Sequence, residues 1–161
     1  MERQLLEHAV RLKNHEALMN IEAYKQSHQL LLEGRKKGMD AVKEFISIAT
    51  SQGSSKPHYY YSHASKMINI AAFEGIQWDT NTPEHFRNML TAEEKQHLSA
   101  TEAYFETILR KEMTKGGKYK DIWRSSAAKL TQIADILGKR QLEFTLPTVV
   151  RKPKIKDEAV I

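Results

Sequence analysis

The segment Thr91–Leu142 reads TAEEKQHLSATEAYFETILRKEMTKGGKYKDIWRSSAAKLTQIADILGKRQL. Its start, Thr91-Ala-Glu-Glu94, fits the capping box, in which the threonine oxygen accepts from a backbone N–H and the glutamate reaches back. A helix is therefore expected to begin near Ala92. The pair Gly116-Gly117 should end this helix, because glycine adopts left-handed backbone angles without steric cost.

A second helical pattern follows the glycine pair and stops at Gly138. Apolar residues recur at helical spacing in both patterns: Leu98, Phe105 and Ile108 in the first, with Glu112 in register, and Trp123, Ala127, Leu130, Ala134 and Leu137 in the second, supported by Ile122, Ile133 and Ile136. Two amphipathic helices joined by a short turn pack antiparallel as a hairpin. We therefore expect such a hairpin, with Trp123 buried in it.

The first third of the chain predicts two helices. Residues 1–33 carry an apolar stripe, and Gly34 is the expected stop. A basic turn through Gly38 and an amphipathic helix over Met39–Ser51 follow. The length of the first helix would suit self-association, but its stripe is interrupted by polar residues, which favours packing within one chain.

Two more helices are expected between residues 58 and 90. Ser62 is the expected cap of a helix that continues through Phe73. Thr82-Pro83-Glu84 combines a capping threonine, a proline at the first helical position and an acid, and predicts a short helix from Pro83 to Leu90. The predicted fold class is all-α, a single small bundle of four to five helices with an extended basic C-terminal tail.

The helices are expected to form one domain over residues 1–142, in which the linker 51–57 offers a sub-boundary, and residues 143–161 are expected to form the tail. Within Leu142–Val150 apolar and polar residues alternate around Pro147. This pattern predicts an extended segment that lies across the helices as an edge strand.

The composition excludes several classes of protein. The 161 residues contain no cysteine, which excludes disulfides, thiolate metal sites and thiol nucleophiles. No apolar run reaches the roughly 18 residues of a membrane span, and the N-terminus lacks the apolar core of a signal peptide. We therefore expect a cytoplasmic protein.

Positive charge is concentrated in the C-terminal third. Up to Leu109 the chain has 12 Lys and Arg against 14 Asp and Glu, and from Arg110 onward it has 13 against 6. Such an end suits a polyanionic partner, either nucleic acid or an acidic protein surface, and the alternative is a solubilising tail. The candidate phosphate-binding residues are Arg110, Lys111, Lys115, Lys118, Lys120, Arg124, Lys139, Arg140, Arg151, Lys152, Lys154 and Lys156.

Three adjacent tyrosines, Tyr59, Tyr60 and Tyr61, form the main aromatic signal. Aromatic rings with a lysine nearby can stack on the bases of a single strand. They can equally clamp a loop to the core with their hydroxyls outward, and this interpretation is favoured.

Catalytic and metal motifs are weak. Glu94 and His97 have the Glu-x-x-His spacing of carboxylate-bridged di-iron bundles, but the sequence contains no second Glu-x-x-His pair. There is no His-x-x-x-His pair, no nucleophile elbow and no phosphate-binding glycine loop. We therefore expect neither an enzyme nor a bound cofactor or metal.

Residues 130–141 resemble the first helix and turn of a helix-turn-helix, with Ala134 and Gly138 at the spacing that lets the next helix pack closely. Pro147 falls where the recognition helix should continue, and an interior proline costs about 3 kcal/mol there. An ordinary amphipathic helix with a glycine cap is therefore the favoured interpretation.

The sequence leaves two functional hypotheses. The first is a non-catalytic helical protein that binds DNA or RNA through its basic C-terminal third, as a regulator or an accessory subunit of a nucleoprotein assembly. The alternative is an adaptor or structural subunit that docks a protein partner through its helices and tail.

Overall fold

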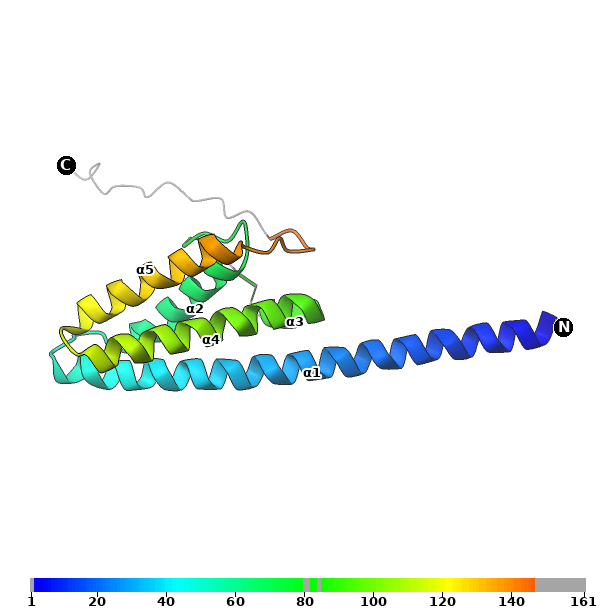
Figure 1. Cartoon of the computed structure of the whole chain (residues 1–161), viewed down its shortest axis with the longest axis horizontal. Helices are drawn as coiled ribbons and strands as arrows, with labels where there is room; N and C mark the ends of the chain where they lie inside the picture. The colour runs from blue at the N-terminus through cyan, green and yellow to red at the C-terminus, as the bar shows by residue number, and fades with distance from the viewer. Residues whose placement is uncertain (1, 80–81, 84, 147–161) are drawn as a thin grey trace, which may run out of the picture.

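The computed structural model (Figure 1) describes residues 2–79, 82–83 and 85–146, and for residues 2–6 and 8–20 it describes the backbone alone. This part of the chain forms five helices: α1 (Glu2–Ser51), α2 (Tyr59–Ala72), α3 (Phe86–Met89), α4 (Ala92–Lys115) and α5 (Tyr119–Leu137). No strand occurs among these residues, where the one isolated bridge pairs Phe73 with Arg140. The all-α prediction is confirmed. The basic arm beyond Leu146 lies outside the described residues.

Helix α1 is continuous over 50 residues, so the predicted break between Gly34 and Gly38 is wrong. Gly34 faces α4, and a Cβ atom added there would lie 3.0 Å from Ser99 Oγ and 3.6 Å from Glu102 Oε2. The glycine therefore permits a close approach of two helices. Tertiary packing outweighs its helix propensity, which is about 1 kcal/mol less favourable than that of alanine.

Helices α1 and α4 lie side by side and run in the same direction (Figure 1). Three pairs along the interface show this register: His28 with Lys95, Glu44 with Arg110 and Gln52 with Gly117 are separated in sequence by 67, 66 and 65 residues. Because α4 starts level with the middle of α1, the N-terminal part of α1 extends beyond the other helices (Figure 1).

Helices α2 and α5 run back against this pair and complete the bundle (Figure 1), so the predicted α4–α5 hairpin is confirmed. Trp123 of α5 is only 6% exposed, as predicted, and its ring centroid lies 4.9 Å from that of Phe45 and 4.7 Å from that of Tyr60. The last turn of α5 departs from the prediction, because Ile136 is 82% exposed and Leu137 is also exposed. The apolar stripe of α5 therefore loses its partner helices before it reaches Gly138.

The predicted helix ends agree with the structure at some positions and differ at others. The capping box is present, since Glu94 N donates to Thr91 Oγ1 and Thr91 N donates to Glu94 Oε1. Ser62 is not a cap, because α2 starts one turn earlier at Tyr59 and the Ser62 hydroxyl donates to the Tyr59 carbonyl. The helix expected from Pro83 to Leu90 is reduced to the single turn of α3.

After α5 the chain crosses back over the bundle. Arg140 N donates to the Ala72 carbonyl, and the Arg140 carbonyl accepts from Glu74 N. Leu142, Phe144 and Leu146 then pack against the core as half-buried side chains. Residues 142–146 form no strand, because they meet helices rather than another strand: their apolar side chains pack on the core, and Glu143 N donates to a side-chain atom, Glu94 Oε2.

Among the described residues, none of the helices combines the length and apolar composition needed to cross a bilayer.

We predict that Trp123→Ala lowers the free energy of unfolding by about 3–5 kcal/mol, because it leaves a cavity among Phe45, Tyr60 and Phe105. Urea denaturation monitored by circular dichroism measures the change. Ile136→Ala on the same helix is the control and should change stability by less than about 0.5 kcal/mol, since its side chain is exposed. Equal effects of the two substitutions would contradict the buried position of Trp123.

Candidate nucleic-acid interface

The turn between α4 and α5 is fixed by Gln52, the residue that directly follows α1. Gln52 Nε2 donates to the Gly117 carbonyl at 2.9 Å, and Gln52 Oε1 accepts from Tyr119 N at 2.7 Å. Gly116 and Gly117 adopt φ values of 74° and 109°, which residues with a Cβ atom rarely adopt. One amide group thus holds both sides of the turn and sets the position of the residues that follow it.

An open cleft of about 780 Å³ lies beside this turn, between the first turns of α2 and α5. Its described lining comprises Ser54, Ser55, Lys56, Tyr59, Tyr60, His63, Tyr119, Lys120, Trp123, Arg124 and Ala127. Three of these residues are cations and none is acidic. The cleft therefore combines aromatic surface with positive charge.

The aromatic wall has a buried part and an exposed part. Tyr60 packs edge-on against Phe45 and Trp123, with ring centroids 4.9 Å and 4.7 Å apart, and burial raises the pKa of its hydroxyl, with a further rise from Tyr119. Tyr59 is 54% exposed and touches the rest of the wall through His63, at 5.9 Å between ring centroids. Tyr60 thus clamps α2 to the core, whereas the ring of Tyr59 is open to a ligand.

His63 lies at the centre of the aromatic wall. Its ring stacks on that of Tyr60 at 6.2 Å and meets the ring of Trp78 edge-on at 4.6 Å. Burial lowers the pKa of His63, and the charge of Lys66 lowers it further. The imidazole is therefore neutral at pH 7 and belongs to the aromatic surface of the cleft rather than to its positive charge.

The cations of the cleft come from two segments. Lys56 precedes α2, while Lys120 and Arg124 lie one turn apart on α5. The side chain of Arg124 is 81% exposed, and its Nη1 lies 4.0 Å from Asp121 Oδ1, a separation at which an exposed ion pair contributes little. The charges of Lys120 and Arg124 are therefore accessible to a phosphate.

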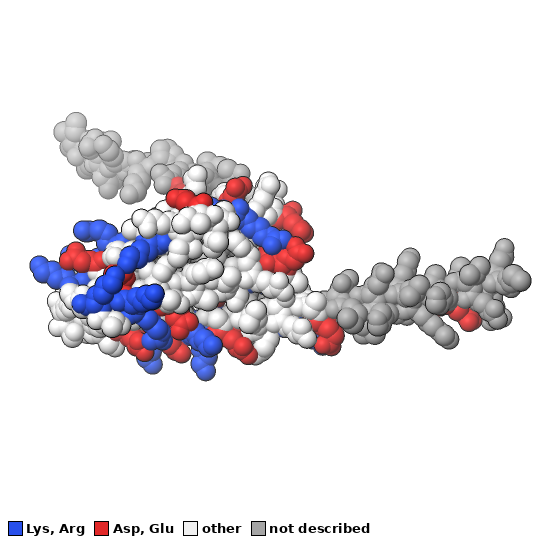
Figure 2. Space-filling model, viewed as in Figure 1, with Lys and Arg blue, Asp and Glu red and all other residues white. Residues whose placement is uncertain are grey.

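Other predicted phosphate-binding residues lie at the same end of the molecule. Figure 2 shows Lys and Arg gathering at this end, interleaved with acidic residues. Lys111 and Lys118 are exposed, whereas Lys115 donates to Glu112 at 3.1 Å. Glu112 also accepts a hydrogen bond from Lys129, and this ion pair links α4 to α5.

The remaining predicted cations are placed elsewhere or have structural partners. Arg110 bonds Glu44 of α1 and Glu106 of α4, and these bonds, led by that to Glu106, raise its pKa. Lys139 and Arg140 lie at the far end of α5, and Arg140 pairs with Glu93. Arg151, Lys152, Lys154 and Lys156 lie outside the described residues.

Of the three predicted tyrosines, the structure brings Tyr59 and Tyr60 into the cleft, while Tyr61 stacks on His58 at 6.4 Å. Sequence reasoning did not select Lys56, His63 or Tyr119 as site residues. Lys56 could have been found from its place three residues before the tyrosine run. No sequence signal indicates that Tyr119, which follows the α4–α5 turn, lines the cleft, because only the fold brings it there.

Glu94 and His97 do not form a metal site. Glu94 Oε1 closes the capping box and Oε2 accepts from Glu143 N, while His97 Nε2 donates to the Ala72 carbonyl at 2.6 Å. Among the residues with described side chains, no group of three His, Cys, Asp or Glu is placed to hold a metal ion.

Comparison with protein-family models, curated proteins and solved structures finds no match to this chain.

The geometry around Glu112 predicts a dependence of stability on pH. Hydrogen bonds from Lys129 and then Lys115 lower the pKa of Glu112 from 4.5 to about 2. A carboxyl group with a lowered pKa in the folded state stabilises that state above its unfolded pKa and loses this contribution as the pH falls. Glu112→Gln should therefore be less stable than the native protein at pH 7, and the difference should shrink between about pH 5 and pH 2.

Thermal unfolding at a series of pH values measures this difference. Asp135→Asn is the control, because it removes an exposed carboxylate from α5 that has no ion pair within the described residues. A difference between Glu112→Gln and the native protein that stays constant down to pH 2 would contradict the ion pairs of Glu112.

Proposed function

We propose that this protein binds single-stranded nucleic acid at the cleft beside the α4–α5 turn, as a non-catalytic regulator or accessory subunit of a nucleoprotein assembly. The observation that supports this function is the joint presence of Lys56, Lys120 and Arg124 with the exposed ring of Tyr59, without an acidic residue in the described lining. Proteins that bind single strands combine a positively charged groove with aromatic rings on which bases stack.

Each part of the cleft has a role in this function. The ring of Tyr59 offers a face to an unstacked base, while Tyr60 and Trp123 hold the wall in place from below. Lys120 and Arg124 bind the phosphates on either side of that base. Because these are contacts with base faces and phosphates, the protein binds many sequences with similar affinity.

The fixed turn supports the function energetically. Gln52 bonds both Gly117 and Tyr119, so the start of α5 is ordered before a ligand arrives. A preorganised site loses less conformational entropy on binding than a mobile one. The exposed Lys111 and Lys118 add long-range attraction for a polyanion at the same end of the molecule.

Charge reversal at Lys120 and Arg124 should weaken binding and lower its salt dependence. Each phosphate contact on a single strand adds about −0.7 to the slope of log affinity against log salt, so the double variant should lose about 1.4. Fluorescence anisotropy with labelled oligothymidylate and oligouridylate, from about 50 to 200 mM salt, measures the affinity and the slope.

The matched control is Lys139→Glu, which reverses an exposed charge at the far end of the same helix. It changes the net charge of the protein without touching the cleft. If Lys139→Glu lowered the slope as much per charge as the cleft variants, phosphate contact at the cleft would be disproved and only a diffuse electrostatic attraction would remain.

Replacement of Tyr59 should separate stacking from charge. Tyr59→Ala is expected to cost about 1–3 kcal/mol of binding free energy, the range for the loss of one base–aromatic stack, with the salt slope unchanged. Tyr59→Phe should bind like the native protein, because the ring face rather than the hydroxyl makes the contact. If Tyr59→Ala bound the oligonucleotides with the affinity of the native protein, the stacking role of Tyr59 would be excluded.

An adaptor function is the second candidate, and the shape of α1 favours it. The helix extends beyond the bundle, and Ile21, Leu30 and Leu32 on it are about half exposed. Complete absence of nucleic-acid binding at about 50 mM salt, where electrostatic attraction is only weakly screened, would remove the first function and leave this one.

A further inference from the structure

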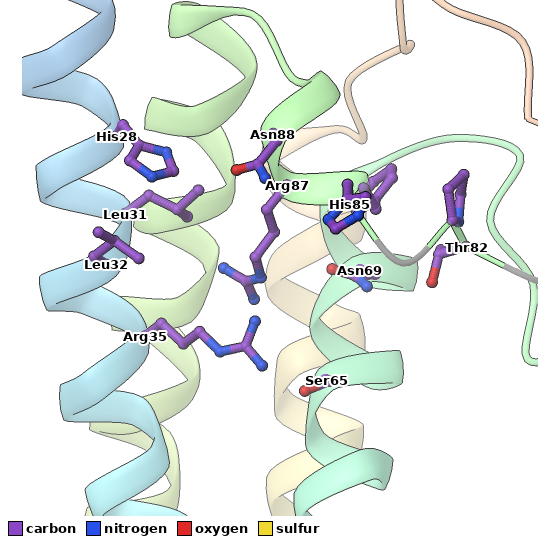
Figure 3. A pocket seen from close by; sticks show the side chains of 12 residues that line it. His28, Leu31, Leu32, Arg35, Ser65, Asn69, Thr82, His85, Arg87 and Asn88 are labelled. Atoms are coloured by element: carbon purple, nitrogen blue, oxygen red, sulfur yellow. The ribbon is translucent and has the colours of Figure 1, made fainter.

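A second pocket lies away from the cleft, between α1, α2 and the segment that carries α3 (Figure 3). Its volume is about 490 Å³, within the range of roughly 300–1,000 Å³ that is usual for small-molecule sites. The described linings of the pocket and the cleft have no residue in common. Figure 3 shows the guanidinium groups of Arg35 from α1 and Arg87 from α3 turned toward each other across it.

The charges in this pocket are not balanced by the described residues. Its described lining contains two arginines and two histidines and no carboxylate. One acid lies behind the wall: Glu102 of α4, whose side chain is 1% exposed, forms an ion pair with Arg87. Among the described residues, one carboxylate thus faces two guanidinium groups.

The titration behaviour of these groups reflects the imbalance. Burial lowers the pKa of Arg35, the charge of Arg87 lowers it further, and Glu102 opposes both effects. Burial raises the pKa of Glu102 against the opposing influence of Arg87 and Arg35. The described part of the pocket therefore has more positive than negative charge, and burial disfavours the charged forms of Arg35 and Glu102.

Hydrogen-bonding capacity in the pocket is also unused. Arg87 Nη1 is buried without a hydrogen-bond partner among the described residues, while Arg87 Nη2 bonds Glu102. The Asn69 Oδ1 atom on α2 is likewise buried and unpaired within the described structure. Glu102 Oε2, behind the wall, is a third buried atom without a partner in the described structure. Buried polar atoms in native proteins nearly always have a partner, and a ligand that accepts from Arg87 and donates to Asn69 would satisfy two of these three.

His28 contributes a donor to the same wall. Lys95 Nζ lies 3.0 Å from His28 Nδ1 and 3.6 Å from the centre of the Tyr24 ring. A lysine ammonium can only donate, so Nδ1 accepts and the proton of the neutral imidazole resides on Nε2. The histidine then adds a further N–H to a pocket that is already rich in donors.

We propose that this pocket binds a phosphate group, either as free phosphate or as the phosphate of a small monoester. Two guanidinium groups from opposite walls suit a tetrahedral anion, whose oxygens point in several directions, better than a planar carboxylate that one guanidinium satisfies. A phosphate hydroxyl or a group of the ester can donate to Asn69. Glu102 holds Arg87 in position and leaves its Nη1 for the ligand.

Isothermal titration calorimetry of the full chain tests this site, with inorganic phosphate in one arm and ribose 5-phosphate, a monoester without a base that could stack in the cleft, in the other, at constant ionic strength. We expect saturable binding of one ligand per chain. Equal affinity for the two ligands would indicate a site for free phosphate, and tighter binding of ribose 5-phosphate would indicate a site for a monoester. No saturable binding in either arm would overturn the proposal.

Arg35→Gln is the decisive variant, because Arg35 is exposed enough to be replaced without breaking a described ion pair. It should weaken phosphate binding about tenfold or more, the effect of losing a charge-assisted hydrogen bond. Lys37→Gln removes the same charge from the same helix outside the pocket and should leave the affinity unchanged. Equal losses in the two variants would overturn the site.

Arg87→Lys provides an independent check, because lysine keeps the charge that faces Glu102 but replaces the planar fork of donors with one ammonium group. Its far-UV circular dichroism should match that of the native protein while phosphate binding weakens. Neither Arg35→Gln nor Arg87→Lys should alter oligonucleotide binding at the cleft, so failure of this site and failure of the proposed function give different results.

Discussion

The close parallel packing of α1 against α4 is the constraint on which the rest of the structure depends. Gly34 lets the two backbones approach, and two buried polar side chains of α4 bond α1: Lys95 lies 3.0 Å from His28 Nδ1, and Ser99 Oγ donates to the Leu30 carbonyl. Buried charges are tolerated only when they are paired, so these contacts fix one register between the helices. That register places Gln52 beside the α4–α5 turn and Arg35 opposite Arg87.

The two proposed sites differ in how strongly their cations are exposed to water. In the cleft, Lys120 and Arg124 are solvated, so their effect is long-ranged and depends on salt. In the pocket, Arg35 and Arg87 are partly removed from water, so their effect is local and demands a ligand of defined shape. The first kind of site suits a polymer of repeated phosphates, and the second suits a single small anion.

Local signals in the sequence predicted what depends on neighbouring residues. The capping box at Thr91, the glycine stop at Gly116 and the burial of Trp123 follow from spacing and backbone chemistry within one helix. The continuity of α1 could not be predicted in this way. From helix propensity alone, Gly34 indicates a helix end, but in the structure it lies inside α1 where α4 packs closely against it. A glycine can therefore end a helix or permit close helix packing, and the position of the partner helix decides which.

The candidate sites show the same division. The charge asymmetry and the tyrosine run marked residues of the cleft. They did not show that Arg110 and Arg140 form close ion pairs with carboxylates, whereas Arg124 lies 4.0 Å from its exposed partner Asp121. The pocket left no sequence signal, because Arg35 and Arg87 are 52 positions apart and are brought together only by the fold. Charge composition indicates how much cationic surface exists, but not which cations are available.

The parallel register of α1 and α4 also bears on how the chain reaches its fold. Contacts between these helices join residues 65 to 67 positions apart, whereas α4 and α5 meet across a turn of a few residues. Closing a longer loop costs more conformational entropy, so bringing α1 against α4 is entropically costlier than pairing α4 with α5. The close contact at Gly34 therefore belongs to the interface whose formation restricts the chain most.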